Sequence, residues 1–286
     1  MVYQLSVYEK AMPDSLTLEE KLLASIEMGY DSCEICIDMD ESRQQRLDWP
    51  NQKFEQFNQF LSENQLRIYS VSLSALRGSP LGSLDPELIS LAFERIEKGL
   101  KFAQRIGAGV MLVNAYDVYD EESTLATQQQ FAHTIQRVAE LAAKYQVIVG
   151  LENAEMAFGD TLEKVVKWVQ KVDSPWLQAY FDPANSYNAL DGSTERVQAD
   201  FQAGAKYVKA IHLKDSRPGD YRMTPYGEGQ VEFDAMIPLL VENHQQCYTA
   251  ELFMQDETQW FQYGQWVNRY LRRFIDQAYE TIEGEN

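Results

Sequence analysis

The chain is poor in the residues that mark several common protein classes. Its 286 residues include three cysteines and three histidines, and 25 Lys and Arg stand against 44 Asp and Glu, for a formal net charge of −19. An odd number of cysteines argues against a disulfide framework. The excess of acid argues against a nucleic-acid partner, because a polyanion is repelled unless a basic stripe offsets the charge, and the sequence has no such stripe.

Long apolar runs are also missing from the sequence. No stretch approaches the roughly 18 apolar residues of a membrane-spanning helix. The first residues, Met1–Lys10, do not combine a basic segment with an apolar one, as a secretory leader would. We therefore expect a cytoplasmic protein without a targeting segment and without a membrane partner.

Two of the cysteines, Cys33 and Cys36, form a C-x-x-C motif. Such a motif can mark a zinc or redox site. Here it lies in an apolar, strand-like run, where a separation of three residues places the two side chains on opposite faces. We predict that both cysteines are packing residues.

What the chain does contain is an alternation of short apolar runs and longer segments with helical periodicity. The strand-like runs are Gln4–Tyr8, Ser32–Ile37, Arg67–Leu73, Gly109–Asn114, Val147–Glu152, Leu177–Asp182, Tyr207–Leu213 and Cys247–Phe253. The helical segments are Thr17–Met28, Asn51–Asn64, Pro86–Ile106, Ser123–Tyr145, Asp160–Lys171, Arg196–Gly204, Phe233–Asn243 and Glu257–Glu280. The runs are nearly continuous in apolar residues, as in a parallel sheet covered on both faces.

Residues at the segment boundaries support this division. Asp85 precedes Pro86, a pairing typical of a helix N-cap followed by proline in the first turn. Gly29 and Gly107 follow helical segments, where a left-handed residue commonly ends a helix. Eight βα units without a linker predict one α/β domain over residues 1–286, a (β/α)8 TIM barrel. An open doubly wound sheet is the alternative, but no glycine-rich G-x-G-x-x-G turn follows the first strand-like run.

Four consecutive strand-like runs, the fifth to the eighth, carry an acid or a histidine at or near their ends. These residues are Glu152, Asp182, His212 and Glu251, separated by 30, 30 and 39 residues. Each interval is about one βα unit, and the carboxyl ends of barrel strands meet at one face. Three carboxylates and one imidazole suit a divalent ion such as Mn²⁺, Mg²⁺, Co²⁺ or Zn²⁺. We predict one such ion as the cofactor.

The other two histidines, His133 and His244, lie in a helical segment and just after one. We expect both to face solvent. With one histidine at a strand end, the chain does not supply the histidine-rich, three-metal site of a nuclease on this fold.

The most distinctive stretch of sequence is His-Leu-Lys-Asp-Ser-Arg-Pro-Gly at 212–219, followed by Pro-Tyr-Gly-Glu-Gly at 225–229. Shorter motifs occur at Val7–Pro13, Arg46–Trp49, Pro80–Ser83 and Tyr116–Tyr119. With these motifs, nearly the whole chain resembles the L-ribulose-5-phosphate 3-epimerase / hexulose-6-phosphate isomerase-like group of xylose-isomerase-like TIM barrels. Within that group it resembles the L-xylulose-5-phosphate 3-epimerases of anaerobic L-ascorbate catabolism.

The resemblance implies an isomerase that interconverts L-xylulose 5-phosphate and L-ribulose 5-phosphate through an enediolate. It implies that the four strand-end residues bind the metal and that Glu152 and Glu251 form the acid–base pair. Epimerisation at C3 requires one group to remove a proton beside the carbonyl and a second to return a proton from the other face. A divalent ion that holds the O2 and O3 oxygens would stabilise the enediolate.

A sugar phosphate also needs cationic partners in the protein, best supplied by guanidinium groups. The candidates are Arg77 after the third strand-like run and Lys214, Arg217 and Arg222 after the seventh. Two further candidates for contact with the substrate are Asn185 and Glu155, each three residues after a predicted metal ligand.

One segment departs from the pattern that the resemblance implies. Residues 74–79 read Ser-Ala-Leu-Arg-Gly-Ser, with Leu76 in a place where a His-Arg-Arg-type stretch is expected. This departure leaves open an aldose–ketose isomerase, or an epimerase of an unphosphorylated ketose, on the same fold. A non-catalytic sugar-binding barrel is a third alternative, against which the complete set of four ligands argues. A homodimer is compatible with the sequence, which does not fix the oligomeric state.

Overall fold

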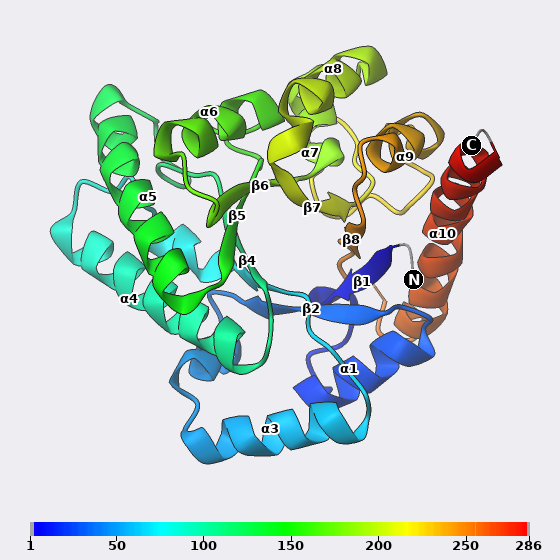
Figure 1. Cartoon of the computed structure of the whole chain (residues 1–286), viewed down its shortest axis with the longest axis horizontal. Helices are drawn as coiled ribbons and strands as arrows, with labels where there is room; N and C mark the ends of the chain where they lie inside the picture. The colour runs from blue at the N-terminus through cyan, green and yellow to red at the C-terminus, as the bar shows by residue number, and fades with distance from the viewer. Residues whose placement is uncertain (1–2, 255, 285–286) are drawn as a thin grey trace. The chain divides into compact units, whose positions relative to one another are not determined.

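The computed structural model describes residues 3–254 and 256–284 and forms a closed barrel of parallel strands in the order β1 to β8 (Figure 1). The strands are β1 (Gln4–Tyr8), β2 (Ser32–Ile37), β3 (Ser70–Leu73), β4 (Val110–Asn114), β5 (Ile148–Glu152), β6 (Leu177–Phe181), β7 (Val208–Leu213) and β8 (Cys247–Ala250). The predicted (β/α)8 class is therefore confirmed.

Helices alternate with the strands along the chain. They are α1 (Leu18–Glu27), α2 (Glu41–Gln44), α3 (Asn51–Glu63), α4 (Pro86–Arg105), α5 (Leu125–Tyr145), α6 (Leu162–Val172), α7 (Pro183–Ala189), α8 (Thr194–Gly204), α9 (Phe233–Glu242) and α10 (Trp260–Gly284). Among the described residues, none of these helices is both long enough and apolar enough to cross a lipid bilayer.

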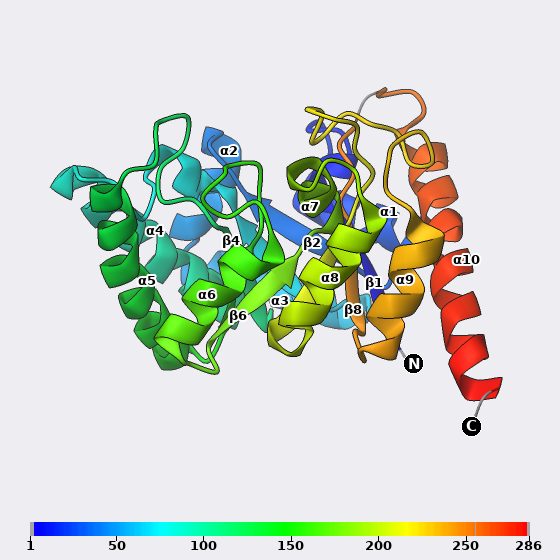
Figure 2. The same ribbon diagram turned by 90° about the horizontal axis from the view of Figure 1, so that it is seen from above.

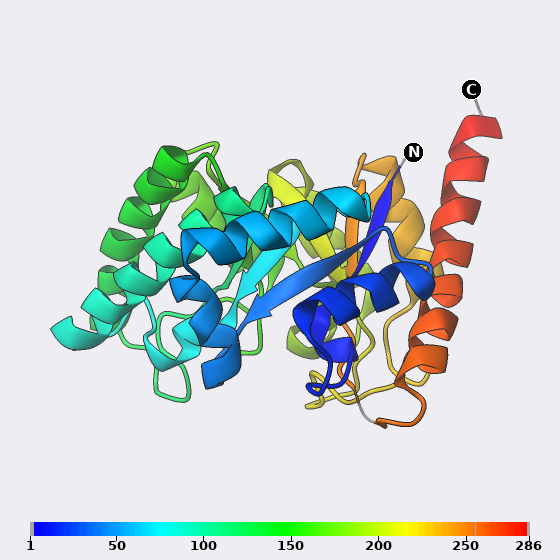
Figure 3. The same ribbon diagram turned by 90° about the horizontal axis from the view of Figure 1, so that it is seen from below.

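The contacts divide the chain into two compact units. The first runs to Cys33, includes Thr161–Glu163 and resumes at Phe181. In it β8 pairs with β1 and with β7, and Ala250 lies opposite both Val7 and Leu213. Helices α9 and α10 pack side by side (Figure 2). The end of α1 lies against the first turns of α10 (Figure 3), where the Tyr30 hydroxyl donates to the Gly264 carbonyl over 3.0 Å.

The second unit comprises Glu34–Asp160 and Lys164–Tyr180. It contains strands β3 to β5 and most of β2 and β6 in consecutive parallel pairs, with Asn114 opposite Glu152. Helices α4 and α5 pack against each other in this unit. The prediction that residues 1–286 behave as one domain stays a prediction.

The boundary residues act as the sequence indicated. Asp85 caps α4 by accepting from the Glu87 amide over 2.8 Å, with Pro86 in the first turn. Gly29 and Gly107 have φ values of +97° and +79°, in the left-handed region that favours glycine.

Other predictions can be compared with the structure at single residues. Cys33 and Cys36 are fully buried in β2, and His133 and His244 are exposed, as predicted. Helix α7 was not predicted, although Asp182-Pro183 repeats the cap signal that marks the start of α4.

Candidate metal centre

Three of the four predicted metal ligands meet in the first unit. Asp182 directly follows β6, His212 lies in β7 and Glu251 directly follows β8. Each offers one potential ligand atom, and these atoms lie within 4.8 Å of one another. Asp182 and His212 are buried, and the Glu251 side chain is 10% exposed. The cluster therefore presents two carboxylates and an imidazole to one small volume.

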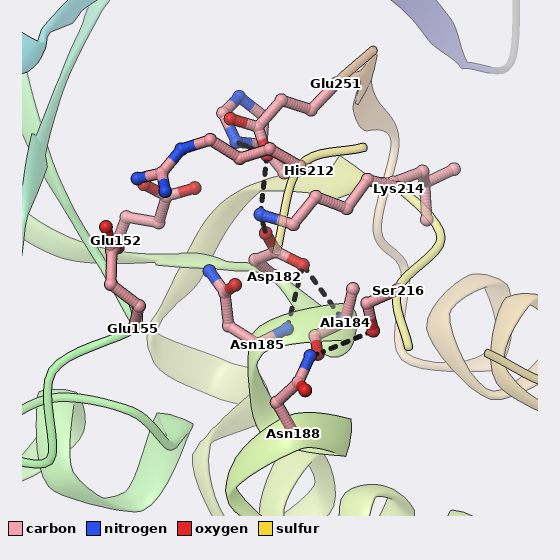
Figure 4. Close-up of polar contacts among 12 residues, drawn as sticks. Glu152, Glu155, Asp182, Ala184, Asn185, Asn188, His212, Lys214, Ser216 and Glu251 are labelled. Atoms are coloured by element: carbon pink, nitrogen blue, oxygen red, sulfur yellow. Dashed lines mark hydrogen bonds and ion pairs between the residues drawn. The ribbon is translucent and has the colours of Figure 1, made fainter. Parts of the chain in front are cut away.

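Asp182 is held by the helix that it begins. Its Oδ1 accepts hydrogen bonds from the backbone amides of Ala184 (2.8 Å) and Asn185 (3.3 Å), which caps α7. Asp182 Oδ2 instead lies 2.7 Å from the ammonium nitrogen of Lys214 (Figure 4). One oxygen thus fixes the carboxylate, and the other faces a cation.

Glu251 faces the same cation. Its Oε2 accepts a hydrogen bond from Lys214 Nζ over 2.8 Å and lies 3.6 Å from Nδ1 of His212. The Glu251 backbone amide donates to the Leu213 carbonyl over 2.8 Å, which joins the end of β8 to the end of β7. Lys214 is itself 5% exposed, so its charge lies inside the protein between two carboxylates.

Burial and these charges move the two carboxylates in opposite directions. Burial raises the pKa of Asp182, and the nearby Lys214 ammonium opposes that shift only in part. Burial also acts to raise the pKa of Glu251, but Lys214 and His212 outweigh it and lower that pKa to about 2. Glu251 is therefore ionised at neutral pH, as a metal ligand or a general base must be.

The loop after β7 is tied to a buried carboxylate that the sequence analysis did not single out. Asp215 accepts hydrogen bonds from the backbone amides of Gly227 and Gly229 (2.9 Å each) and of Val231 (3.2 Å). Gly227 has a φ of +82°, and a Cβ on Gly229 would lie 1.9 Å from Asp215 Oδ1. The Gly-Glu-Gly motif therefore folds back onto Asp215. The signal for this contact was the run His-Leu-Lys-Asp itself, followed by two closely spaced glycines.

The other candidates of the first unit lie around this loop and α7. Arg217 donates to the Glu228 carbonyl (3.0 Å) and carboxylate (2.8 Å), and its side chain is 52% exposed. Arg222 is half-buried and near enough to Glu251 to contribute to its lowered pKa. Asn185 is buried in the first turn of α7, beside Asp182.

The remaining candidates belong to the second unit. Glu152 ends β5, is buried, and accepts a hydrogen bond from the Asn114 side chain. Glu155 accepts from the hydroxyls of Tyr116 and, over 3.5 Å, Tyr119.

Arg77, in the turn after β3, donates to the Asp38 carboxylate over 2.7 Å. Its guanidinium also lies 5.8 Å from the centre of the Tyr119 ring. Leu76, in the same turn, is buried. The Arg77 guanidinium is thus paired with the carboxylate of Asp38, the residue that directly follows β2.

Comparison with known proteins points to a family of TIM barrels, in agreement with the observed fold. A family described as "Xylose isomerase-like TIM barrel" matches residues 22–270. The chain is 31% identical over 239 residues to the L-ribulose-5-phosphate 3-epimerase UlaE of Escherichia coli (strain SMS-3-5 / SECEC), covering 84% of this chain and 83% of that protein.

Solved structures show the same fold. A D-psicose 3-epimerase from Clostridium cellulolyticum H10, crystallised with D-tagatose, gives a TM-score of 0.79 at 14% identity and covers 95% of this chain and 99% of that chain. A structure described as L-ribulose 3-epimerase gives a TM-score of 0.79 at 13% identity and covers 98% of this chain and 97% of that chain.

Proposed function

The chain belongs to the xylose isomerase-like TIM barrel family and is a sugar epimerase, and we propose that it interconverts L-xylulose 5-phosphate and L-ribulose 5-phosphate at C3. The observation that carries this choice of substrate is the 31% identity over 84% of the chain to proteins named for L-ribulose 5-phosphate. We place the reaction in the cytoplasm and in L-ascorbate catabolism as part of the same proposal.

The donor set fits a divalent metal ion. Asp182 Oδ2 and Glu251 Oε2 already converge on one cationic atom, Lys214 Nζ, with His212 Nδ1 beside them. We propose Glu152, at the end of β5, as the fourth ligand, as the family resemblance implies. Oxygen-rich sets with one imidazole are typical of sites for Mn²⁺, Mg²⁺, Co²⁺ or Zn²⁺. When bound, the ion would supply Lewis acidity to the oxygens at C2 and C3 of the ketose.

Glu152 and Glu251 are the proposed acid–base pair. Glu251 is ionised at neutral pH and can accept the C3 proton, which leaves an enediolate. Glu152, protonated at the start, then donates its proton to C3 from the other face and is left ionised, and the two residues exchange roles in the reverse direction. Asn114 orients the Glu152 carboxylate by donating a hydrogen bond to Oε2.

For the substrate phosphate we propose Arg222 as the main cation. The positive charge of Arg222 helps to lower the pKa of Glu251, which places Arg222 near the metal site. The Lys214 ammonium instead contacts two carboxylates, and Arg217 pairs with Glu228. Asn185, beside Asp182, is the proposed contact for a sugar hydroxyl.

In the second unit, the Glu155 carboxylate accepts hydrogen bonds from two tyrosine hydroxyls, and we propose it as a further contact for sugar hydroxyls. Arg77 is the second proposed phosphate contact, and it would have to exchange Asp38 for the substrate. An epimerase of an unphosphorylated ketose remains the second candidate, because this ion pair and the buried Leu76 leave fewer donors for a phosphate near the end of β3.

The test is a comparison of kcat/KM for L-ribulose 5-phosphate and L-ribulose with the Mn²⁺-loaded enzyme. We expect a preference for the phosphorylated sugar of about tenfold or more, the value of one charge-assisted hydrogen bond. A preference for the free sugar would replace the proposed substrate with an unphosphorylated ketose.

A further inference from the structure

Lys214 occupies an unusual place for a lysine. Its side chain is 7% exposed, and its ammonium nitrogen lies 2.7 Å from Asp182 Oδ2 and 2.8 Å from Glu251 Oε2. Lysine is seldom buried unless its charge is paired. Here two buried carboxylates pair it, and both are proposed ligands of the metal ion.

The local geometry explains how Lys214 reaches this place. His212 lies in β7 and Lys214 directly follows it, and because they are two residues apart in extended chain their side chains leave on the same side. Asp182 is already fixed through its other oxygen by the amides of α7, so Oδ2 is directed toward the lysine. Figure 4 shows the ammonium between Asp182 and Glu251.

We propose that Lys214 is an internal counter-ion of the metal site. Its ammonium holds Asp182 and Glu251 in place before a divalent ion binds, and it competes with that ion for the same two oxygens. The inference rests on the metal site of the proposed function, but not on the identity of the sugar.

The positive charge of Lys214 has two opposing effects. Without a cation, two carboxylates packed against each other in a buried cluster repel, and each has lost its hydration. The ammonium removes that penalty and stabilises the metal-free protein. The same charge repels a divalent ion, and it must move off the two oxygens before they can coordinate the metal. The flexible side chain of lysine makes such a movement feasible.

Lys214 could instead help the metal to bind, and the two roles predict opposite changes in metal affinity. A residue that merely orients metal ligands helps the metal to bind, and its loss typically weakens binding by about 10- to 100-fold. An internal competitor has the reverse effect. Loss of the competitor lowers the stability of the metal-free protein and tightens metal binding.

The experiment measures the Kd for Mn²⁺ and the metal-free Tm of the full chain carrying Lys214→Met, a substitution of similar length without charge. We expect the metal-free Tm to fall and the Kd to decrease by about tenfold or more, because like charges near contact distance repel strongly in a protein. If the metal-free Lys214→Met variant does not fold, Lys214→Gln, which also removes the charge but keeps a polar group, takes its place in both measurements.

Lys21 provides a matched control in the same unit. Its ammonium is also buried and lies 3.2 Å from the buried carboxylate of Glu9, which is not a proposed ligand. Lys21→Met should lower the Tm in the same way but leave the Kd for Mn²⁺ within about twofold, since no proposed ligand loses its partner.

The outcomes separate the two claims. An unchanged or higher Kd in Lys214→Met would overturn the counter-ion role and leave the proposed function standing. An equal decrease of the Kd in Lys21→Met would also overturn it, because the effect would then follow from net charge alone. A wild-type chain that binds no Mn²⁺ would instead refute the metal site of the proposed function.

Discussion

Asp215 offers the sharpest test of how the loop after β7 is held. The substitution Asp215→Ala removes the acceptor of the neighbouring Ser216 amide and of three amides farther along the loop, those of Gly227, Gly229 and Val231. Hydrogen bonds to a charged group contribute about 1.5–3 kcal/mol each, which would sum to about 5–9 kcal/mol for the three farther amides. Gly227 and Gly229 are exposed, so water replaces part of what is lost, and we expect the free energy of local opening to fall by about 2–4 kcal/mol.

Hydrogen exchange measures this change directly. A loss of that size corresponds to exchange that is about 30- to 1,000-fold faster at the three amides. Asp220→Ala is the matched control, because the carboxylate of Asp220 lies in the same loop but accepts from Arg222, Met223 and Thr224 instead. Unchanged protection at the three amides in Asp215→Ala would refute the argument, as would an equal loss of protection in the control.

The other predictions concern catalysis, the phosphate and pH. Glu152→Gln and Glu251→Gln should each lower turnover by at least about 100-fold, because each removes one of the two proton-transfer groups, and turnover within tenfold of wild type would contradict these roles. Arg222→Ala should raise KM for L-ribulose 5-phosphate by about 10- to 100-fold more than KM for L-ribulose, whereas Arg217→Ala should change this ratio by less than about threefold. Burial acts to raise the pKa of Asp40, but hydrogen bonds from α2 lower it to about 2. This folded-state pKa lies below the ordinary value of 3.8, so ionised Asp40 should stabilise α2 fully above about pH 4 and lose that effect as the pH falls through 2. An NMR titration of the Asp40 carboxyl with a midpoint near pH 4 would count against this prediction.

Much of the fold follows from local signals in the sequence. The bounds of β1 and β2 are as predicted, because each run is short, apolar and flanked by polar residues. The predicted start of β3 at Arg67 was wrong by three residues, since pairing with β4 begins at Ser70. The predicted end of β8 at Phe253 was also too late. The apolar run continues past the last paired residue, Ala250, into the loop that carries Glu251.

For the candidate site, too, the sequence predicts some features and not others. The sequence predicted that Asp182, His212 and Glu251 lie together because the carboxyl ends of barrel strands meet at one face, and their candidate ligand atoms do lie within 4.8 Å of one another. The partners of Lys214 could not be read in this way. Lys214 was expected to meet a phosphate, but its ammonium lies on carboxylates 32 and 37 residues away along the chain.

We propose above all that this chain moves the proton at C3 of a ketose phosphate with the help of a divalent ion and two glutamates. The most direct measurement is NMR of L-ribulose 5-phosphate incubated in D₂O with the Mn²⁺-loaded protein and then freed of the ion. We predict deuterium at C3 together with formation of L-xylulose 5-phosphate, and neither product after the protein is stripped of metal. Deuterium at C1 alone would indicate an aldose–ketose isomerase, and the absence of exchange at both carbons would contradict the account.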